Sequence, residues 1–318
     1  MEWSNTIRKP KIIVSECLHG TKCRYDGQGY NDKVILSLKD YVDIQTVCPE
    51  VSIGLPTPRE PIRIEKDKER EVYKLIDYNS KNDYTNQMTE FAEEFVNGLD
   101  DIDGFILKSK SPTCGIKDVK VYYHGNKCSI RNNGSGFFSQ KIVDKYSYLP
   151  IENEGRLRNY SIRDNFFTRI FLINNLKDSN NIREFHNNNL LLLKSYDEDL
   201  TNEVSDIFNK NKIEENIHQY KEKILNIVSN QRNKDNKLSI IINIFEKYKS
   251  RLNEEEIAMF NDLITSYQNQ KIPFSTLGVV IKMYATRFKD RDVLSQTFFC
   301  PYPENLINIT DSGKGRKL

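Results

Sequence analysis

The stretch KIIVSECLHG, from Lys11 to Gly20, joins an apolar run to a turn that carries a cysteine. The β-branched residues from Ile12 to Val14 indicate a short buried strand, and the glycine indicates the loop that follows it. Cys17 then lies just beyond the carboxyl end of the strand. In open α/β sheets, ligands bind at this edge. The stretch therefore predicts an α/β fold with a functional loop after its first strand.

Two further segments repeat this arrangement. Residues 41–48 form a strand candidate that ends at Cys48, and residues 104–108 form another that leads into the loop SKSPTCG, which contains Cys114. The carboxyl ends of parallel strands meet at one edge of a sheet. We therefore expect Cys17, Cys48 and Cys114 to converge on one site.

The character of the chain changes near residues 150–158, a polar, glutamate-rich stretch that predicts a linker. Beyond it glycine is scarce and apolar residues recur with helical spacing. One helix is expected before the linker, at 84–98, and the others are expected after it, at 160–176, 180–196, 199–209, 213–230, 236–249, 253–269 and 274–288. The fold class expected is an α/β domain with a mostly parallel sheet over residues 1–150, followed by an all-helical domain over residues 159–318.

Composition bounds the function only loosely. The 318 residues hold 47 Lys and Arg against 45 Asp and Glu, a net charge of +2, so a general affinity for nucleic acid is neither indicated nor excluded. No apolar run reaches the roughly 18–20 residues needed to span a bilayer, and the N-terminus lacks the apolar core of a signal peptide. We expect a cytoplasmic protein with no membrane partner, whose six cysteines stay reduced.

Three dispersed cysteines suit an iron–sulfur cluster that keeps one iron open to substrate. The chain has only four histidines and no Cys-x-x-Cys pair, which argues against zinc. Beside Cys48, Glu50 is a candidate general acid or base, or a solvated glutamate at a strand end. Ser109, Ser111 and Thr113 precede Cys114, where their hydroxyls serve either turn formation or the site.

Cys23 lies six residues after Cys17 and has no required role in a three-cysteine site. It is interpreted either as a spare buried thiol or as a fourth ligand, which would close the open iron. Together with Cys17 it also forms the only near pair for a redox dithiol, a weak motif at this spacing.

Residues 10–150 resemble the thiouracil desulfidase (TudS) family. The resemblance lies in four blocks in order: VSECLHG at 14–20 with RYDG at 24–27, VCPEV at 47–51 with GLPTPR at 54–59, LKSKSPTCG at 107–115, and GSGFF at 134–138. It implies removal of sulfur from thiolated uracil, with no nicotinamide cofactor. It also implies a [4Fe–4S] cluster held by three cysteines, with one open iron. The residues implied are Cys17, Cys48 and Cys114 for the cluster, Glu50, Ser111 and Ser109 for catalysis, and Arg24 and Lys108 for the substrate.

Residues 160–308 resemble the helical domain of the longer, RudS-type tRNA 4-thiouridine desulfidases. The matching segments are NFFTRIF at 165–171, EFH at 184–186 and YPENL at 302–306. The resemblance implies that the substrate is 4-thiouridine in tRNA and that the helices hold the RNA. Basic and aromatic residues alternate over 282–291, and the tail 314–317 is basic, which suits RNA contact or an ordinary helix with one buried face.

The sequence leaves four functions open. They are desulfidation of 4-thiouridine in tRNA, desulfidation of free thiouracil, a non-catalytic RNA-binding module with a structural metal, and a redox dithiol protein. The sequence specifies neither the tRNA position nor the number of subunits.

Overall fold

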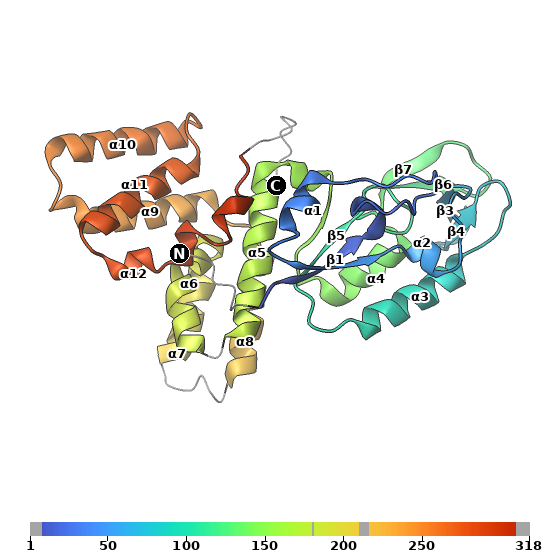
Figure 1. The fold of residues 1–318 in the computed structure, drawn as a ribbon, viewed down its shortest axis with the longest axis horizontal. Helices are drawn as coiled ribbons and strands as arrows, with labels where there is room; N and C mark the ends of the chain where they lie inside the picture. Colours follow the sequence, from blue (N-terminus) through green and yellow to red (C-terminus); the bar gives the residue numbers. More distant parts are fainter. Residues whose placement is uncertain (1–7, 180, 210–215, 310–318) are drawn as a thin grey trace. The chain divides into compact units, whose positions relative to one another are not determined.

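The computed structural model describes residues 8–179, 181–209 and 216–309, which divide into two compact units (Figure 1). The first contains the strands, extends to Asn174 and resumes at Pro303; the second is Asn175–Tyr302. The domain limits 1–150 and 159–318 rest on sequence composition and remain a prediction. Within the part of the chain that is described, no helix is both long enough and apolar enough to cross a bilayer.

A four-stranded parallel sheet forms the centre of the first unit, in the order β2–β1–β5–β8. Its strands are β1 (Lys11–Ser15), β2 (Asp43–Val47), β5 (Gly104–Leu107) and β8 (Ile151–Asn153). The three strands predicted from the sequence are all present. Because β1 lies between β2 and β5, the chain leaves it first toward one side and later toward the other. This order opens a crevice at the carboxyl end of β1.

Helices cover the sheet. They are α1 (Lys33–Leu38), α2 (Pro49–Ser52), α3 (Thr85–Gly98), α4 (Phe137–Tyr146) and α5 (Tyr160–Asp178). Helices α3 and α4 lie side by side (Figure 1), and the ring centroids of Phe95 and Phe138 are 5.3 Å apart between them. On β5, a Cβ atom at Gly104 would stand 2.9 Å from Cγ2 of Ile170 in α5. Glycine at that position therefore permits the close approach of α5 to the sheet.

A second four-stranded sheet was not predicted. It has the order β4–β3–β6–β7 and consists of β3 (Ile62–Lys66), β4 (Tyr73–Asp77), β6 (Val119–Tyr123) and β7 (Ser129–Gly134) (Figure 1). Charged residues interrupt these short strands, so that their alternation is weak. Glu65 is buried nonetheless, since it accepts hydrogen bonds from Arg63 at 2.8 Å and contacts His124 at 2.7 Å.

The stretch 150–158 differs from the predicted linker. Its residues Ile151–Asn153 are β8, which pairs with β5, and a 3-10 turn follows at Arg156–Arg158. The polar composition arises from paired charges. Glu152 binds Arg156 at 2.7 Å, and the buried Glu154 binds Lys108. A strand can therefore be polar where its carboxylates have partners.

The second unit is helical, as predicted. Its helices are α6 (Ile182–Tyr196), α7 (Glu198–Asn209), α8 (Ile217–Ser229), α9 (Lys234–Lys249), α10 (Glu254–Gln268), α11 (Phe274–Arg287) and α12 (Arg291–Leu294). Residues 180 and 213–215 of the predicted helices lie outside the described residues. Helix α6 packs against α7, α8 and α9, while α11 packs against α9, α10 and α12. Phe245 and Phe260 stack at 4.0 Å in this core.

Candidate functional site

Cys17, Cys48 and Cys114 lie on the wall of one cavity of about 400 Å³. Cys17 lies in the 3-10 turn after β1, Cys48 follows β2 directly, and Cys114 lies in the loop after β5. Each thiol therefore stands at the carboxyl end of a strand, and the order β2–β1–β5 brings the three together. Cys17, Cys48 and Cys114 form no disulfide, so that these three are available as ligands.

A fourth thiol, Cys23, lines the same cavity. Hydrogen bonding with Cys17, together with burial, raises the pKa of Cys23 to about 12. The Sγ atom of Cys48 donates to the Cys23 carbonyl at 3.7 Å. Hydrogen bonding with Cys23 and burial raise the pKa of Cys48, and burial raises the pKa of Cys114 to about 12. Cys23, Cys48 and Cys114 are therefore protonated at neutral pH, and a thiol must lose its proton before it can bind a metal.

Glu50 is buried at the start of α2 and is held by both of its oxygens. Its Oε2 accepts from Nε and Nη2 of Arg59 at 2.8 and 2.6 Å, a bidentate, charge-assisted pair. Its Oε1 accepts from Oγ1 of Thr113 at 2.9 Å. Thr113 Oγ1 also lies 2.9 Å from Ser111 Oγ and 3.7 Å from Cys114 Sγ. One hydrogen-bonded network thus joins the carboxylate to a serine and a predicted ligand.

Arg59 was not predicted as a site residue, and Thr113 was predicted only as a hydroxyl beside Cys114 and not as a partner of Glu50. The available signal was their place in the short motifs PTPR and SPTC. Neither motif indicates that its side chain reaches Glu50, because that contact depends on how two loops pack.

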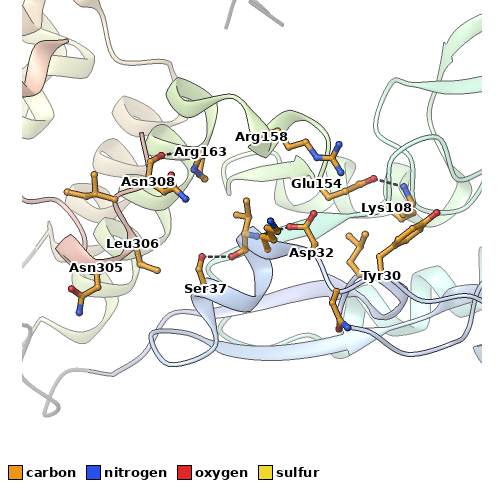
Figure 2. Close-up of a pocket in the computed structure, with 15 residues that line it drawn as sticks. Tyr30, Asp32, Ser37, Lys108, Glu154, Arg158, Arg163, Asn305, Leu306 and Asn308 are labelled. Carbon is orange, nitrogen blue, oxygen red and sulfur yellow. Dashed lines mark hydrogen bonds and ion pairs between the residues drawn. The ribbon is translucent and has the colours of Figure 1, made fainter. Parts of the chain in front are cut away.

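Lys108 and Ser109 bind a carboxylate that the sequence interpretation missed, Glu154. Lys108 Nζ pairs with Glu154 Oε1 (Figure 2), while Ser109 donates its hydroxyl to Oε1 at 2.6 Å and its backbone N–H to Oε2 at 2.8 Å. Burial alone would raise the pKa of Glu154, but the charge of Lys108 and these hydrogen bonds lower it. Glu154 thereby fixes the position of the loop that leads to Cys114.

Glu154→Gln is expected to destabilise the protein by about 2 kcal/mol at neutral pH, because a part-buried Lys108 loses its counter-charge. Since folding lowers the pKa of Glu154, its contribution is present above the ordinary value of about 4.3 and is lost as the pH falls through the lowered value. Urea unfolding of wild type and variant above about pH 5, and then at successively lower pH from about 4 until the lowered pKa has been passed, measures this difference.

The matched control is Glu152→Gln, which breaks the more exposed pair with Arg156 and is expected to cost less than about 1 kcal/mol. An equal loss for Glu154→Gln at all of these pH values would contradict the assignment.

Arg24 lines the cavity and carries a hydrogen-bond donor that could bind a ligand. Its Nη2 pairs with Asp26 at 3.2 Å, and its guanidinium lies 4.5 Å from the ring centroid of Tyr30. Its Nη1 is buried and, among the residues described, has no hydrogen-bond partner. A buried donor left unpaired costs free energy, so this nitrogen suits an acceptor atom on a ligand. Arg24 and Lys108, the two predicted substrate contacts, both lie on this cavity.

The basic and aromatic stretch 282–291 packs mainly within the helical unit. Tyr284 is buried, and its ring stacks on Phe288 at 6.3 Å. The Arg251 guanidinium lies 3.9 Å from the Phe288 ring centroid, and Arg287 pairs with Glu256 at 2.5 Å. These aromatic side chains therefore belong to the buried face of a helix, and they are less suited to stacking on nucleic-acid bases. The basic tail 314–317 lies outside the described residues.

His186, from the EFH segment, is structural. Its two ring nitrogens lie 3.1 Å from Tyr220 Oη and from Ser205 Oγ. Burial lowers its pKa to about 4, so the imidazole is neutral at physiological pH.

The donors of the cavity suit a cluster better than a single ion. Over the described ranges, no three His, Cys, Asp or Glu side chains surround one point closely enough to bind one metal ion. A zinc ion requires sulfur atoms about 2.3 Å from one centre. In an iron–sulfur cluster each thiolate binds a different iron, so its ligands stand around a space. Three thiols at strand ends around a cavity of about 400 Å³ agree with that requirement.

Two families match the chain in succession. Residues 12–154 match the family described as 2-thiouracil desulfurase, and residues 191–303 match a family of unknown function, DUF1722. The uncharacterized protein YbbK of Bacillus subtilis (strain 168) is 33% identical over 149 residues, which are 45% of this chain and 96% of YbbK. A solved structure of a [4Fe–4S]-dependent thiouracil desulfidase, TudS, is 28% identical and covers 47% of this chain and 93% of its own, with a TM-score of 0.38.

The matched residues 12–154 contain the four thiols of the cavity, Glu50 with its partners, and Glu154 at their end. The relative from Bacillus subtilis is matched over nearly its whole length. The chain therefore belongs, through residues 12–154, to the 2-thiouracil desulfurase family.

Proposed function

We propose that the protein is a [4Fe–4S]-dependent desulfidase that converts 4-thiouridine in tRNA to uridine and releases sulfide. One observation carries the proposal: three thiols at strand ends share a cavity with a buried glutamate network and with an arginine nitrogen that has no hydrogen-bond partner among the described residues. The match to the 2-thiouracil desulfurase family supports the type of reaction. The free thiols agree with a reducing compartment, the cytoplasm.

Cys17, Cys48 and Cys114 are the residues that would hold the cluster, because each occupies an equivalent place at a strand end. When bound, the cluster supplies an open iron, a Lewis acid that polarises the carbon–sulfur bond of the substrate. Cys23 lies beside two of these thiols without such a position and is not assigned as a ligand.

The reaction is a hydrolysis. Water adds its oxygen to the thiocarbonyl carbon, the carbon–sulfur bond breaks, and sulfur leaves as hydrogen sulfide with both protons of the water. Carbon keeps its oxidation state, so neither an oxidant nor a reductant is consumed. A base must take one proton from the water and an acid must return it to the sulfur.

Glu50 is the proposed base and acid. Arg59 occupies its Oε2, while its Oε1 faces the hydroxyl of Thr113. Ser111 Oγ accepts from the backbone N–H groups of Thr113 and Cys114, at 3.2 and 3.1 Å. Its proton remains available for donation, either to Thr113 or to the substrate. The path Ser111–Thr113–Glu50 can therefore carry a proton between the cavity and the carboxylate.

The remaining residues position the substrate. The unpaired Nη1 of Arg24 suits a carbonyl oxygen of the base. Lys108 and Ser109 are both bound to Glu154, so that Ser109 acts through the loop it holds. The helical segment that matches DUF1722 is the proposed RNA-holding part. A cavity of about 400 Å³ also admits a free base, which keeps desulfidation of free thiouracil as the second candidate.

The test is turnover by the full chain after anaerobic reconstitution with iron and sulfide. Uridine and sulfide are measured with tRNA containing 4-thiouridine and, in parallel, with free 4-thiouracil. We expect equal amounts of the two products, formed only by the reconstituted protein, and a higher kcat/KM for the tRNA. A higher kcat/KM for the free base would support the second candidate. No turnover of either substrate would leave a non-catalytic RNA-binding module as the better account.

A further inference from the structure

A second and larger cavity lies in the first unit beside the cysteine cavity. It encloses about 860 Å³, within the range of about 300–1,000 Å³ that is usual for small-molecule sites. Its wall is formed by the start of α1, the β8–α5 segment and the C-terminal residues 305–308. Figure 2 shows Tyr30, Lys108 and Glu154 at one end and Arg163, Asn305 and Leu306 at the other.

The charge of its wall favours an anion. The cations are Lys33, Lys108, Arg158 and Arg163, and the carboxylates are Asp32 and Glu154. Both carboxylates are engaged: Asp32 accepts from the backbone N–H groups of Val34 and Ile35, and Glu154 binds Lys108. Arg163 donates to the carbonyls of Leu157 and Asn308.

Two cations of the wall have no side-chain partner among the described residues. Lys33 and Arg158 are exposed, and neither forms an ion pair with any residue in the described ranges. Because the carboxylates of the wall already have partners, these two side chains give the cavity a net positive potential, which attracts anionic ligands.

Tyr30 links this cavity to the site. Its backbone N–H donates to the carbonyl of Cys17 at 2.7 Å. Its half-exposed ring lies 4.5 Å from the guanidinium of Arg24, which lines the cysteine cavity, and 5.9 Å from Nζ of Lys108, which lines both cavities. A ligand that reaches from one cavity to the other therefore passes along an aromatic face flanked by cations.

We propose that the larger cavity binds the phosphate-bearing backbone attached to the thiolated base, with Lys33 and Arg158 as its phosphate contacts. The proposal rests on the proposed function, since it assigns the neighbouring part of the same substrate. Phosphate contacts from Lys and Arg hold a nucleic acid in register, and aromatic rings stack on its bases. A free base has no phosphate and gains nothing from this cavity. The ligand is thus a nucleotide, present alone or within an RNA strand.

Binding is tested first, because it does not depend on turnover. The probe is a fluorescein-labelled uridylate decamer, titrated with reconstituted full-length protein and followed by anisotropy at several salt concentrations. The variant is Lys33→Gln/Arg158→Gln. The control, Lys39→Gln/Lys120→Gln, removes the same charge from exposed positions outside the cavity.

We expect the cavity variant to bind the decamer at least about tenfold more weakly than the control. The slope of log affinity against log salt should be shallower by about 1.4, or about 0.7 for each phosphate that the protein no longer neutralises. Equal affinity and equal slope in the two variants would overturn the proposal.

The source of the phosphate is found by turnover of 4-thiouridine, its 5′-monophosphate and tRNA containing 4-thiouridine. If the cavity variant has a lower ratio of kcat/KM for the monophosphate to kcat/KM for the nucleoside than the control, the cavity binds the 5′-phosphate of the nucleotide itself. If the cavity variant loses turnover only with tRNA, the cavity binds the phosphates of neighbouring nucleotides in the strand. Absence of turnover with all three would count against the proposed function only, and the decamer result would still decide on the cavity.

Discussion

Glu50→Gln is expected to lower kcat for a thiolated uracil by about 10²–10⁴-fold while iron remains bound. Glutamine matches the carboxylate in size and still accepts a hydrogen bond from Thr113, but it cannot take a proton from water. Iron content and product formation, measured on the same reconstituted samples, separate loss of catalysis from loss of the cluster. The alternative of a non-catalytic RNA-binding module predicts instead that replacement of Glu50 or Ser111 changes nothing.

The Glu50→Gln variant also leaves the buried Arg59 without its counter-charge, which can cost about 3–5 kcal/mol of stability. Glu50→Gln/Arg59→Gln removes both charges and keeps the test usable if the single variant does not fold. Partial recovery of Glu50→Ala by added formate would identify the missing group as a carboxylate. An unchanged kcat in folded, iron-loaded Glu50→Gln would refute the assignment of Glu50.

Cys17→Ala, Cys48→Ala and Cys114→Ala are each expected to lose both iron and turnover. The wild type should take up about four irons per chain on anaerobic reconstitution. Each replacement removes one thiolate from the cavity, and no histidine lines that cavity to replace it. Iron and sulfide analysis with an absorption spectrum gives a readout that is independent of activity.

Cys128→Ala is the matched control, since Cys128 is an exposed thiol away from the cavity and should keep full loading. Cys23→Ala decides the number of ligands. We expect it to retain iron and turnover, as a three-cysteine site requires. Loss of iron from Cys23→Ala would show that Cys23 is a fourth ligand. Unchanged iron uptake after replacement of Cys17, Cys48 and Cys114 would refute the desulfidase mechanism.

The parts predicted from the sequence are those with a local signature. An uninterrupted β-branched run marks β1, and helical spacing with few glycines marks the helices from α5 to α11. The convergence of Cys17, Cys48 and Cys114 followed from one rule about the carboxyl ends of parallel strands. The second sheet lacked such a signature, because its short strands carry charges that are neutralised only after folding, as at Glu65.

The contacts that the sequence interpretation missed share a physical cause. Glu154 meets Lys108 across 46 positions of sequence, and Thr113 meets Glu50 across 63. The local composition of a segment indicates which secondary structure that segment can form. It does not indicate which distant side chain will neutralise a charge in it. Glu154 consequently looked like part of a solvated linker, and Cys23 like a spare thiol.

The course of the chain has a consequence for protein engineering. The helical unit begins at Asn175 and ends at Tyr302, so it is inserted within the first unit and not appended to it. A truncation after Asn174 would also delete Asn305, which donates to the Tyr41 hydroxyl at 3.0 Å, and Asn308, which accepts from Arg163. A minimal version without the helical unit must therefore be made by excision, with a linker that joins Asn174 to Pro303.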